Sequence, residues 1–257
     1  MNDFLTSRKR RFIATSIHEQ VQEAVQFSVE RNAVSLVVGR PGNGKSTSIR
    51  HIAEADPRAI LLDFKPRFRT TKGMHRAFME ACGWWHSHKN GHDLEVAAEA
   101  CARERAETGN YLLVDEYQNF DLEAVRALLR FNDDYGLPII LVGNFSRLRR
   151  TKTDAHTYEQ ITSRIWKSIK LDNPIRQDFI EIGVEYNLEG QPAYEELVVL
   201  GHNTCIREAV QVLETARALR GEHGSLGVEH LREAVNFLTE GATKNLTLAT
   251  PGLRTVR

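Results

Sequence analysis

A short glycine-rich stretch, Gly39–Ser46, constrains this chain more than any other part of its sequence. It reads GRPGNGKS and follows directly on the apolar run Ala33–Val38. Clustered glycines mark a backbone that turns sharply or approaches another group closely. Glycine, four residues, glycine, lysine and serine is the spacing in which backbone N–H groups face phosphate oxygens at the start of a helix. A turn that binds nothing is disfavoured, because an expected strand precedes this stretch and an expected helix follows it.

We expect this loop to bind the phosphates of ATP. Lys45 would reach the outer phosphates, and Ser46 would bind Mg²⁺. The positive end of the helix that begins near Lys45 would add to the attraction for anions. The residues expected to bind the nucleotide are Gly39, Pro41, Gly42, Asn43, Gly44, Lys45, Ser46 and Thr47.

Strand-like and helix-like segments alternate through most of the chain. Short apolar runs bounded by turn or charged residues are typical of strands buried on both faces of a parallel sheet. Such runs lie at 33–38, 59–64, 111–114 and 138–143, and helical spacing is expected at 16–31, 45–55, 72–82, 93–107 and 121–133. The alternation predicts a doubly wound α/β domain.

The pattern changes after Lys170–Pro174, beyond which only helical periods follow. The apolar stripes are Ile206, Val210, Leu213 and Ala216, and then Val228, Leu231, Val235 and Leu238. We therefore expect a basic N-terminal arm at 1–15, a nucleotide-binding domain at 16–173, a small helical lid domain at 174–241 and a polar tail at 242–257.

Two carboxylates, Asp115 and Glu116, end the third apolar run. The carboxyl ends of strands are where α/β sheets bind ligands. We expect Asp115 to hold Mg²⁺ through water and Glu116 to be the base that activates the attacking water. Taken alone, such a pair more often marks the start of a helix, so this interpretation depends on the phosphate loop. Asn144, after the next run, would orient the water beside the γ-phosphate or would simply form a turn.

The bulk composition limits the class of partner. The chain has 257 residues, with 34 basic and 34 acidic side chains, so no global field draws it to nucleic acid or to a membrane. Three widely spaced cysteines are typical of reduced thiols in a cytosol. Because no apolar run approaches the roughly 20 residues that cross a bilayer, we expect a cytoplasmic enzyme with no membrane partner.

The order of these motifs, with a helical lid after the sheet, resembles the AAA+ ATPases from about Thr15 to Gly241. The resemblance implies an α/β P-loop NTPase in which Asn144 is the first sensor residue. It also implies that Arg164 is an arginine finger given to a neighbouring subunit, and that Arg207 is the second sensor. A finger supplied in trans is worth roughly 10³–10⁵ in rate, so the isolated subunit should hydrolyse ATP poorly. An ordinary surface or helix-pairing arginine is the alternative for each.

Within this superfamily, Asp115–Asn119 is similar to the acidic-acidic-x-glutamine motif of transposon target-selection ATPases, the phage Mu B-like family. Gln118 is the suggestive residue. The resemblance implies an ATPase that assembles on double-stranded DNA without strong sequence preference and recruits or stimulates a transposase or integrase. Its working form would be a homo-oligomeric ring or helical filament. The family's Mu member has a further N-terminal DNA-binding domain, whereas about 15 residues precede the expected core here.

Two basic clusters interrupt the otherwise neutral sequence. They are Lys65, Arg67, Arg69 and Lys72, and then Arg147, Arg149, Arg150 and Lys152. Charge runs are usually solvated loops, but two loops at strand ends would line one DNA-binding pore or groove. About four neutralised phosphates give a dissociation constant of only roughly 10⁻⁴–10⁻⁶ M, so useful binding needs several subunits. We expect backbone contacts with little base reading, and the run Arg8–Arg11 is a third candidate contact.

Two alternative functions stay open at this point. The first is a remodeller of the helicase-loader type that acts mainly on a protein partner, and the second is a nucleotide-dependent switch with no DNA role. A metal site in Cys82–His92 is disfavoured, because its spacing fits no standard zinc pattern. Trp84 and Trp85 are expected to pack against the core or a neighbouring subunit.

Overall fold

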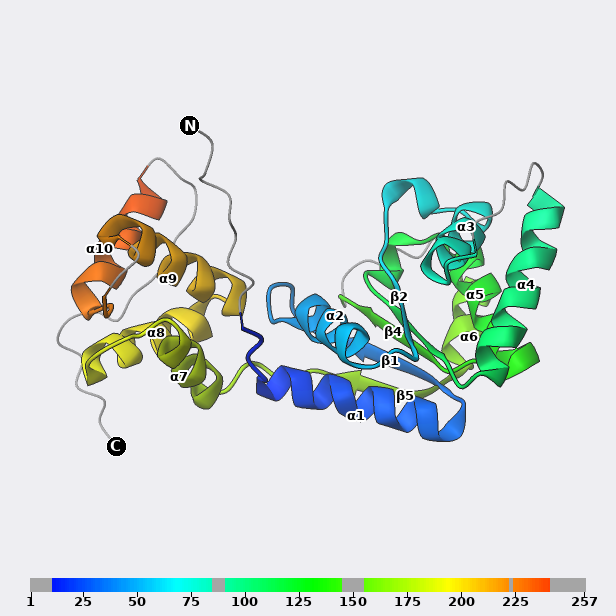
Figure 1. Ribbon diagram of the computed structural model, residues 1–257, viewed down its shortest axis with the longest axis horizontal. Coiled ribbons are helices and arrows are strands. Elements are labelled where there is room, and N and C mark those ends of the chain that lie inside the picture. Colours follow the sequence, from blue (N-terminus) through cyan, green and yellow to red (C-terminus); the bar gives the residue numbers. More distant parts are fainter. Residues whose placement is uncertain (1–10, 85–90, 145–154, 222–223, 241–257) are drawn as a thin grey trace. The chain divides into compact units, whose positions relative to one another are not determined.

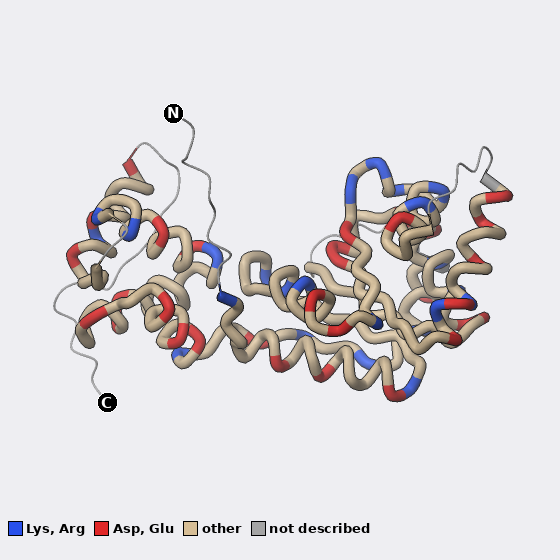
Figure 2. Tube along the Cα trace, viewed as in Figure 1, with Lys and Arg blue, Asp and Glu red and all other residues tan. Residues whose placement is uncertain are grey.

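The computed structural model describes residues 11–84, 91–144, 155–221 and 224–240, which form two compact units (Figure 1). One unit is Ile17–Asp172, and the other is built from Asn173 onward together with Ile13 and Ser16. Among the described residues, no helix is long and apolar enough to cross a membrane. Basic and acidic residues are interspersed along both units, as Figure 2 shows.

The first unit is built on a parallel five-stranded sheet in the order β2-β3-β4-β1-β5. The strands are β1 Val34–Val38, β2 Ala59–Leu62, β3 Tyr111–Val114, β4 Ile139–Gly143 and β5 Ile165–Lys170. Every residue of β3 and β4 is buried, as expected for strands covered on both faces. Because all five strands run in one direction, their carboxyl ends lie along one edge of the sheet. The predicted α/β fold with a parallel sheet is confirmed.

Helices cover both faces of this sheet, with α1 and α2 on one face and α3 to α6 on the other (Figure 1). Their bounds are α1 Ser16–Arg31, α2 Lys45–Ala55, α3 Thr71–Ala81, α4 Gly91–Glu107, α5 Leu122–Tyr135 and α6 Ala155–Thr162, with short turns η1 Pro66–Phe68 and η2 Tyr117–Asn119. Phe78, Leu112 and Leu128 are among the side chains fully buried between the sheet and α3 to α5. Each such side chain contributes about 1.5–3 kcal/mol by leaving water, which holds helices that would be marginal alone.

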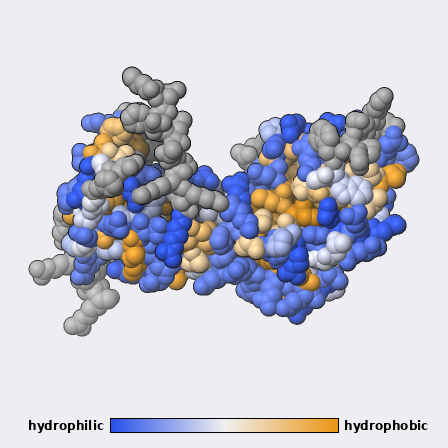
Figure 3. Space-filling model, viewed as in Figure 1, coloured by the Kyte–Doolittle hydropathy of each residue, from blue (hydrophilic) through white to orange (hydrophobic). Residues whose placement is uncertain are grey.

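The edge strand β5 differs from the continuous apolar strands at the centre. Its register against β1 shifts, because Val34 pairs with Ile165 and Ser35 with Lys167. Trp166 is the extra residue of this β-bulge, and 68% of its surface is exposed. A bulge at a sheet edge re-aims a side chain and discourages pairing with another strand. The outer strand on the opposite side of the sheet is β2, and hydrophobic residues gather in its region on the face shown in Figure 3.

The second unit is helical. Its helices are α7 Arg176–Glu185, α8 Gln191–Asn203, α9 Ile206–Arg220 and α10 Val228–Thr239. Leu213 and Leu231, from the two predicted stripes, are fully buried in its core. Ile13 packs against this core, and Ser16 donates from its backbone N and its Oγ to Asp178 at 2.7 and 2.6 Å. The described end of the N-terminal segment therefore belongs with the helical unit.

Candidate nucleotide-binding site

The predicted phosphate loop joins β1 to α2 at the carboxyl edge of the sheet. Gly44 precedes α2 with φ 93°, and Gly42 has φ 83°. A Cβ atom on Gly44 would meet nothing within 4 Å, so the left-handed backbone, and not crowding, is what favours glycine there. Lys45 and Ser46 are the first residues of α2, so their N–H groups lie at the positive end of the helix. The eight residues expected to bind the nucleotide, from Gly39 to Thr47, all lie in this loop or in the first turn of α2.

The ammonium of Lys45 ties this loop to the neighbouring strand end. Lys45 is buried, and its Nζ donates to the backbone oxygens of Gly39 and Arg40 at 3.0 and 2.8 Å. It also donates to Oδ1 of Asn144, the residue after β4, at 2.9 Å. A buried charge needs such partners, and these three acceptors supply them. The structure thus brings two of the predicted site residues, Lys45 and Asn144, into direct contact.

A hydroxyl and a carboxylate meet beside this lysine. Ser46 Oγ donates to Oδ1 of Asp115 at 3.1 Å, and the backbone N of Glu116 donates to the same oxygen at 3.0 Å. Asp115 is only 2% exposed, and burial raises its pKa, against the lowering effect of the Ser46 hydrogen bond. Oxygen ligands of this kind are the ones that Mg²⁺ prefers, and a divalent cation would offset the cost of burying the charge. The residues present therefore fit the expected magnesium site.

The candidate base, Glu116, has an unusual backbone. Its φ is 51°, a left-handed value that non-glycine residues rarely adopt and that costs on the order of 1 kcal/mol. Strain of this kind persists where the surrounding structure enforces it, and it clusters at functional sites. The carboxylate is held in place, because its Oε2 accepts hydrogen bonds from Gln118 Nε2 at 2.5 Å and Asn119 Nδ2 at 3.4 Å.

Gln118 lies between Glu116 and Asn144, a position that the sequence does not predict. Its side chain is buried, and besides its bond to Glu116 its Oε1 accepts a hydrogen bond from the backbone N of Asn144 at 3.4 Å. The amide lies against Gly143, where an added Cβ would come within 2.0 Å of Gln118 Oε1. In the sequence this glutamine indicates a family resemblance, but its spacing does not predict that it contacts the end of β4.

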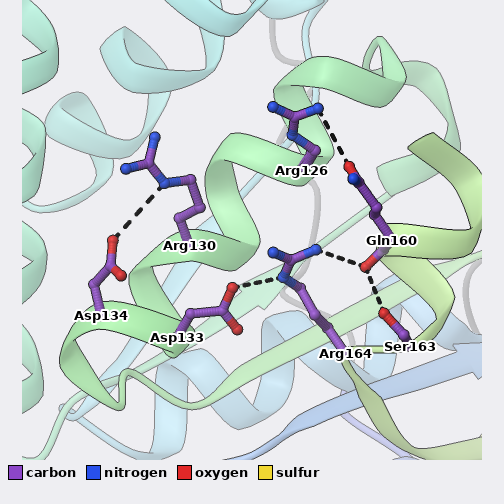
Figure 4. Close-up of a pocket in the computed structure, with 7 residues that line it drawn as sticks. All are labelled: Arg126, Arg130, Asp133, Asp134, Gln160, Ser163 and Arg164. Carbon is purple, nitrogen blue, oxygen red and sulfur yellow. Dashed lines mark hydrogen bonds and ion pairs between the residues drawn. The ribbon is translucent and has the colours of Figure 1, made fainter. Parts of the chain in front are cut away.

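Arg164 lies at the amino ends of the strands, whereas the phosphate loop of its own unit lies at their carboxyl ends. It comes directly before β5, whereas the loop follows the neighbouring parallel strand β1. Its Nε donates to Asp133 at 2.5 Å, and its Nη1 donates to the backbone oxygen of Gln160 at 2.7 Å. These groups line a pocket of about 650 Å³ (Figure 4). The other lining residues are Arg126, Arg130, Asp134 and Ser163.

Arg207 lies in the first turn of α9, in the helical unit, and its side chain is exposed. A cation near the N-terminus of a helix is electrostatically unfavourable. The stability of α9 therefore gives no reason for an arginine at this position. Its assignment as the second sensor stays a prediction.

The first basic cluster lies on η1 and at the start of α3, after β2. Arg67 pairs with Glu80 at 3.3 Å, and Arg69 pairs with Asp121 at 2.7 Å. The two arginine side chains are 64% and 69% exposed. Exposed pairs of this kind contribute only about 0–1 kcal/mol, so phosphates can replace the acids as partners.

An aromatic side chain anchors this basic turn to the core. Phe68 is buried, and the charged ends of Lys65 and Arg67 lie 5.9 and 4.6 Å from the centre of its ring. Lys72 is exposed in the first turn of α3. The turn is thus an ordered element that presents cations at the edge of the sheet where the phosphate loop lies. The second cluster, Arg147, Arg149, Arg150 and Lys152, lies outside the described residues, as do Arg8, Lys9 and Arg10.

The tryptophan and histidine stretch after α3 shows no metal site in its described part. No group of three His, Cys, Asp or Glu side chains is placed to hold a metal ion within the described ranges. Trp84 packs against the core of the α/β unit, as expected, whereas Trp85 lies outside the described residues.

Comparison with known proteins supports the same fold. A model of the family described as AAA domain matches residues 29–151. The Mu-like prophage FluMu DNA transposition protein B of Haemophilus influenzae is 23% identical over 182 residues, which cover 69% of this chain and 62% of that protein's length.

Solved structures of archaeal and bacterial proteins share the fold at low identity. The ORC2 protein of Aeropyrum pernix is 16% identical with a TM-score of 0.62, covering 91% of this chain and 71% of that one. Cdc6p of Pyrobaculum aerophilum is 14% identical with a TM-score of 0.60, covering 90% and 68%. A RuvB mutant of Thermotoga maritima is 16% identical with a TM-score of 0.56, covering 86% and 68%. At these identities the likeness shows the fold alone.

Proposed function

We propose that this chain, an AAA+ ATPase related to a Mu-like DNA transposition protein B, hydrolyses ATP with Mg²⁺, assembles on double-stranded DNA and regulates transposition by recruiting or stimulating a transposase or integrase. The observation that carries the ATPase part is the meeting of Lys45, Ser46, Asp115 and Glu116 at one edge of the sheet. The DNA and transposition parts depend on the likeness to the Haemophilus protein and on the exposed basic turn around Phe68.

The side chains have separate roles in the proposed reaction. The loop N–H groups and the Lys45 ammonium bind the phosphates of ATP. Ser46 and Asp115 are the residues that would hold Mg²⁺, which when bound neutralises charge on the phosphate oxygens. Glu116 accepts the proton of the attacking water, and Asn144 orients that water through its side-chain amide.

Assembly is proposed because Arg164, the candidate arginine finger, lies at the opposite end of the strands from the phosphate loop of its own unit. Arg164 precedes β5, while the phosphate loop follows β1, so Arg164 faces away from the loop of its own α/β unit. Two residues along the chain, the bulged Trp166 is exposed. Tryptophan is enriched among the residues that contribute most of the binding energy of protein interfaces. These features support a homo-oligomer, a ring or a helical filament, in which Arg164 of one subunit completes the site of the next.

Glu116→Gln is the variant that tests the proposed function most directly. We expect it to keep its affinity for ATP and to stay assembled on duplex DNA, while turnover falls at least about 10²-fold because the amide cannot take a proton from water. Turnover is measured as phosphate release, and assembly by electron microscopy and sedimentation with duplex DNA and ATP. Glu107→Gln, which removes an exposed carboxylate from α4, is the matched control and should behave as wild type. Wild-type turnover by Glu116→Gln would remove Glu116 as the base.

The basic turn gives a separate prediction about DNA. Replacing Arg67 and Arg69 with alanine should weaken binding to all duplex sequences alike and reduce the slope of log K against log salt by about 2, because two phosphate contacts are lost. The double variant of Arg31 and Arg58, two exposed arginines elsewhere in the α/β unit, removes the same charge and should leave the slope unchanged. An unchanged slope in the Arg67 and Arg69 variant would show that these side chains contact solvent and not DNA phosphates.

The same measurements separate the proposal from its two alternatives. ATP-dependent assembly on duplex DNA without sequence preference supports a transposition regulator. Tight binding to a hexameric helicase, with no assembly on bare duplex, would instead support a helicase-loader-type remodeller. An ATPase rate that does not respond to DNA at all would support a nucleotide-dependent switch.

A further inference from the structure

A continuous chain of hydrogen bonds joins the phosphate loop to the candidate base. Lys45 Nζ donates to Asn144 Oδ1 at 2.9 Å, and the backbone N of Asn144 donates to Gln118 Oε1 at 3.4 Å. Gln118 Nε2 then donates to Glu116 Oε2 at 2.5 Å. The four residues come from α2, from the end of β4, from η2 and from the end of β3, all at the carboxyl edge of the sheet. One side-chain amide therefore lies between the sensor position and the base.

We propose that Gln118 is a positioning residue, which fixes the carboxylate of Glu116 for water activation and couples it to Asn144. This inference rests on the proposed ATPase function. A primary amide suits the task, because its NH₂ group donates to a carboxylate while its carbonyl accepts from a backbone N–H. A carboxylate at position 118 could not donate, and an apolar side chain could do neither.

The hydrogen bonds that the described residues donate to the Glu116 carboxylate engage only one of its two oxygens. Both donors, Gln118 and Asn119, bind Oε2, and Oε1 accepts no hydrogen bond from the residues that the structure describes. Because the described residues anchor this carboxylate through one oxygen alone, it has a fixed direction in which to accept a proton. A misplacement of about 1 Å at a reacting group can cost roughly 10²-fold in rate, so this anchoring has a measurable effect.

The other end of the chain connects the base to the nucleotide. Asn144 uses its side-chain oxygen for Lys45 and its backbone N–H for Gln118, so the two contacts do not compete. When the Lys45 ammonium turns to bound phosphates, the Asn144 side chain is released to orient water while its backbone still holds Gln118. Gln118 thus fixes the position of Glu116 relative to Asn144, the residue that senses the γ-phosphate in the proposed reaction.

Gly143 allows this arrangement by giving the amide room. A Cβ at position 143 would lie 2.0 Å from Gln118 Oε1 and 2.8 Å from Tyr117 Cδ1. Gly143→Ala should therefore displace the Gln118 amide, together with the Tyr117 ring, without altering Gln118 itself. It gives a second, independent route to the same defect.

The experiment compares Gln118→Met, which has nearly the volume of glutamine but no amide, with wild type in steady-state ATP hydrolysis on duplex DNA. We expect kcat to fall about 10- to 100-fold, with KM and the measured affinity for ATP within about threefold of wild type. Gly143→Ala should show the same split between kcat and KM. Gln26→Met is the matched control, because Gln26 makes a similar amide-to-carboxylate bond to Glu30 on the exposed side of α1, and it should leave kcat unchanged.

Each outcome decides the question. Wild-type kcat in Gln118→Met would overturn the positioning role and leave the ATPase proposal intact. A loss of ATP affinity that accounts for the whole defect would also overturn it, because Gln118 would then only support the fold of the site. If Gln118→Met fails to fold, unchanged kcat in Gly143→Ala would overturn the inference. Absence of magnesium-dependent turnover in the wild type would overturn this inference and the proposed function together.

Discussion

Arg164→Ala is expected to lower ATP turnover of the assembled protein by roughly 10³–10⁵-fold, while its affinity for ATP stays near that of wild type. The reason is the location of Arg164 before β5, at the far edge of the sheet from the phosphate loop that follows β1. In the proposed assembly, an arginine there therefore stabilises the transferring phosphoryl group of a neighbouring molecule. Phosphate release is measured at protein concentrations that give full assembly, beside nucleotide binding.

Mixing experiments separate a finger in trans from a local structural role. Arg164→Ala has an intact base but no finger, and Glu116→Gln has an intact finger but no base. Mixed assemblies should recover part of the turnover that each variant alone lacks. Asp133→Asn, which removes the negative charge paired with Arg164 within the same subunit, is the control and should retain turnover. Failure of the mixture to recover activity, or wild-type rates from Arg164→Ala, would exclude this role.

Lys45→Ala is expected to weaken ATP binding by roughly 10²–10⁴-fold, and with it all ATP-dependent assembly. The ammonium is buried at the start of α2, and the loss of two charge-assisted bonds to phosphates costs about 3–6 kcal/mol. Equilibrium binding of a fluorescent ATP analogue measures the effect. Arg58→Ala, which removes an exposed cation before β2, is the matched control and should bind ATP normally.

The Lys45 substitution also removes the links to Gly39, Arg40 and Asn144, so its thermal unfolding needs to be compared with wild type. A folded Lys45→Ala protein with unchanged affinity for ATP would contradict the assignment of the loop. A folded protein that has lost only its nucleotide affinity would support it.

The elements nearest the site were the ones that sequence could predict. The runs 111–114 and 138–143 are continuous apolar segments because β3 and β4 are buried on both faces, and runs this short are typical of buried parallel strands. The helix after the phosphate loop begins at Lys45, as its motif requires. Because the strands are parallel, their polar ends meet, and the pairing of Ser46 with Asp115 follows from topology.

Features that depend on distant contacts were not predictable in the same way. The bulge that exposes Trp166 arises from a register shift against β1, which local periodicity does not record. The bridge from Gln118 to Asn144 spans 26 positions, and the ion pair of Arg164 with Asp133 spans 31. The pairing of the basic turn with Glu80 and Asp121 is likewise set by how α3 and α5 pack.

The separation of Arg164 from the phosphate loop has a consequence for any assembly built in the proposed way. Each subunit has a donor end and an acceptor end, so its contacts are heterologous and the polymer is directional. An open chain then has one terminal subunit whose ATP no neighbour can reach, while a closed circle has none. Lifetime of the bound triphosphate would accordingly be longest at one tip, which gives a growing polymer a chemical distinction between its two ends.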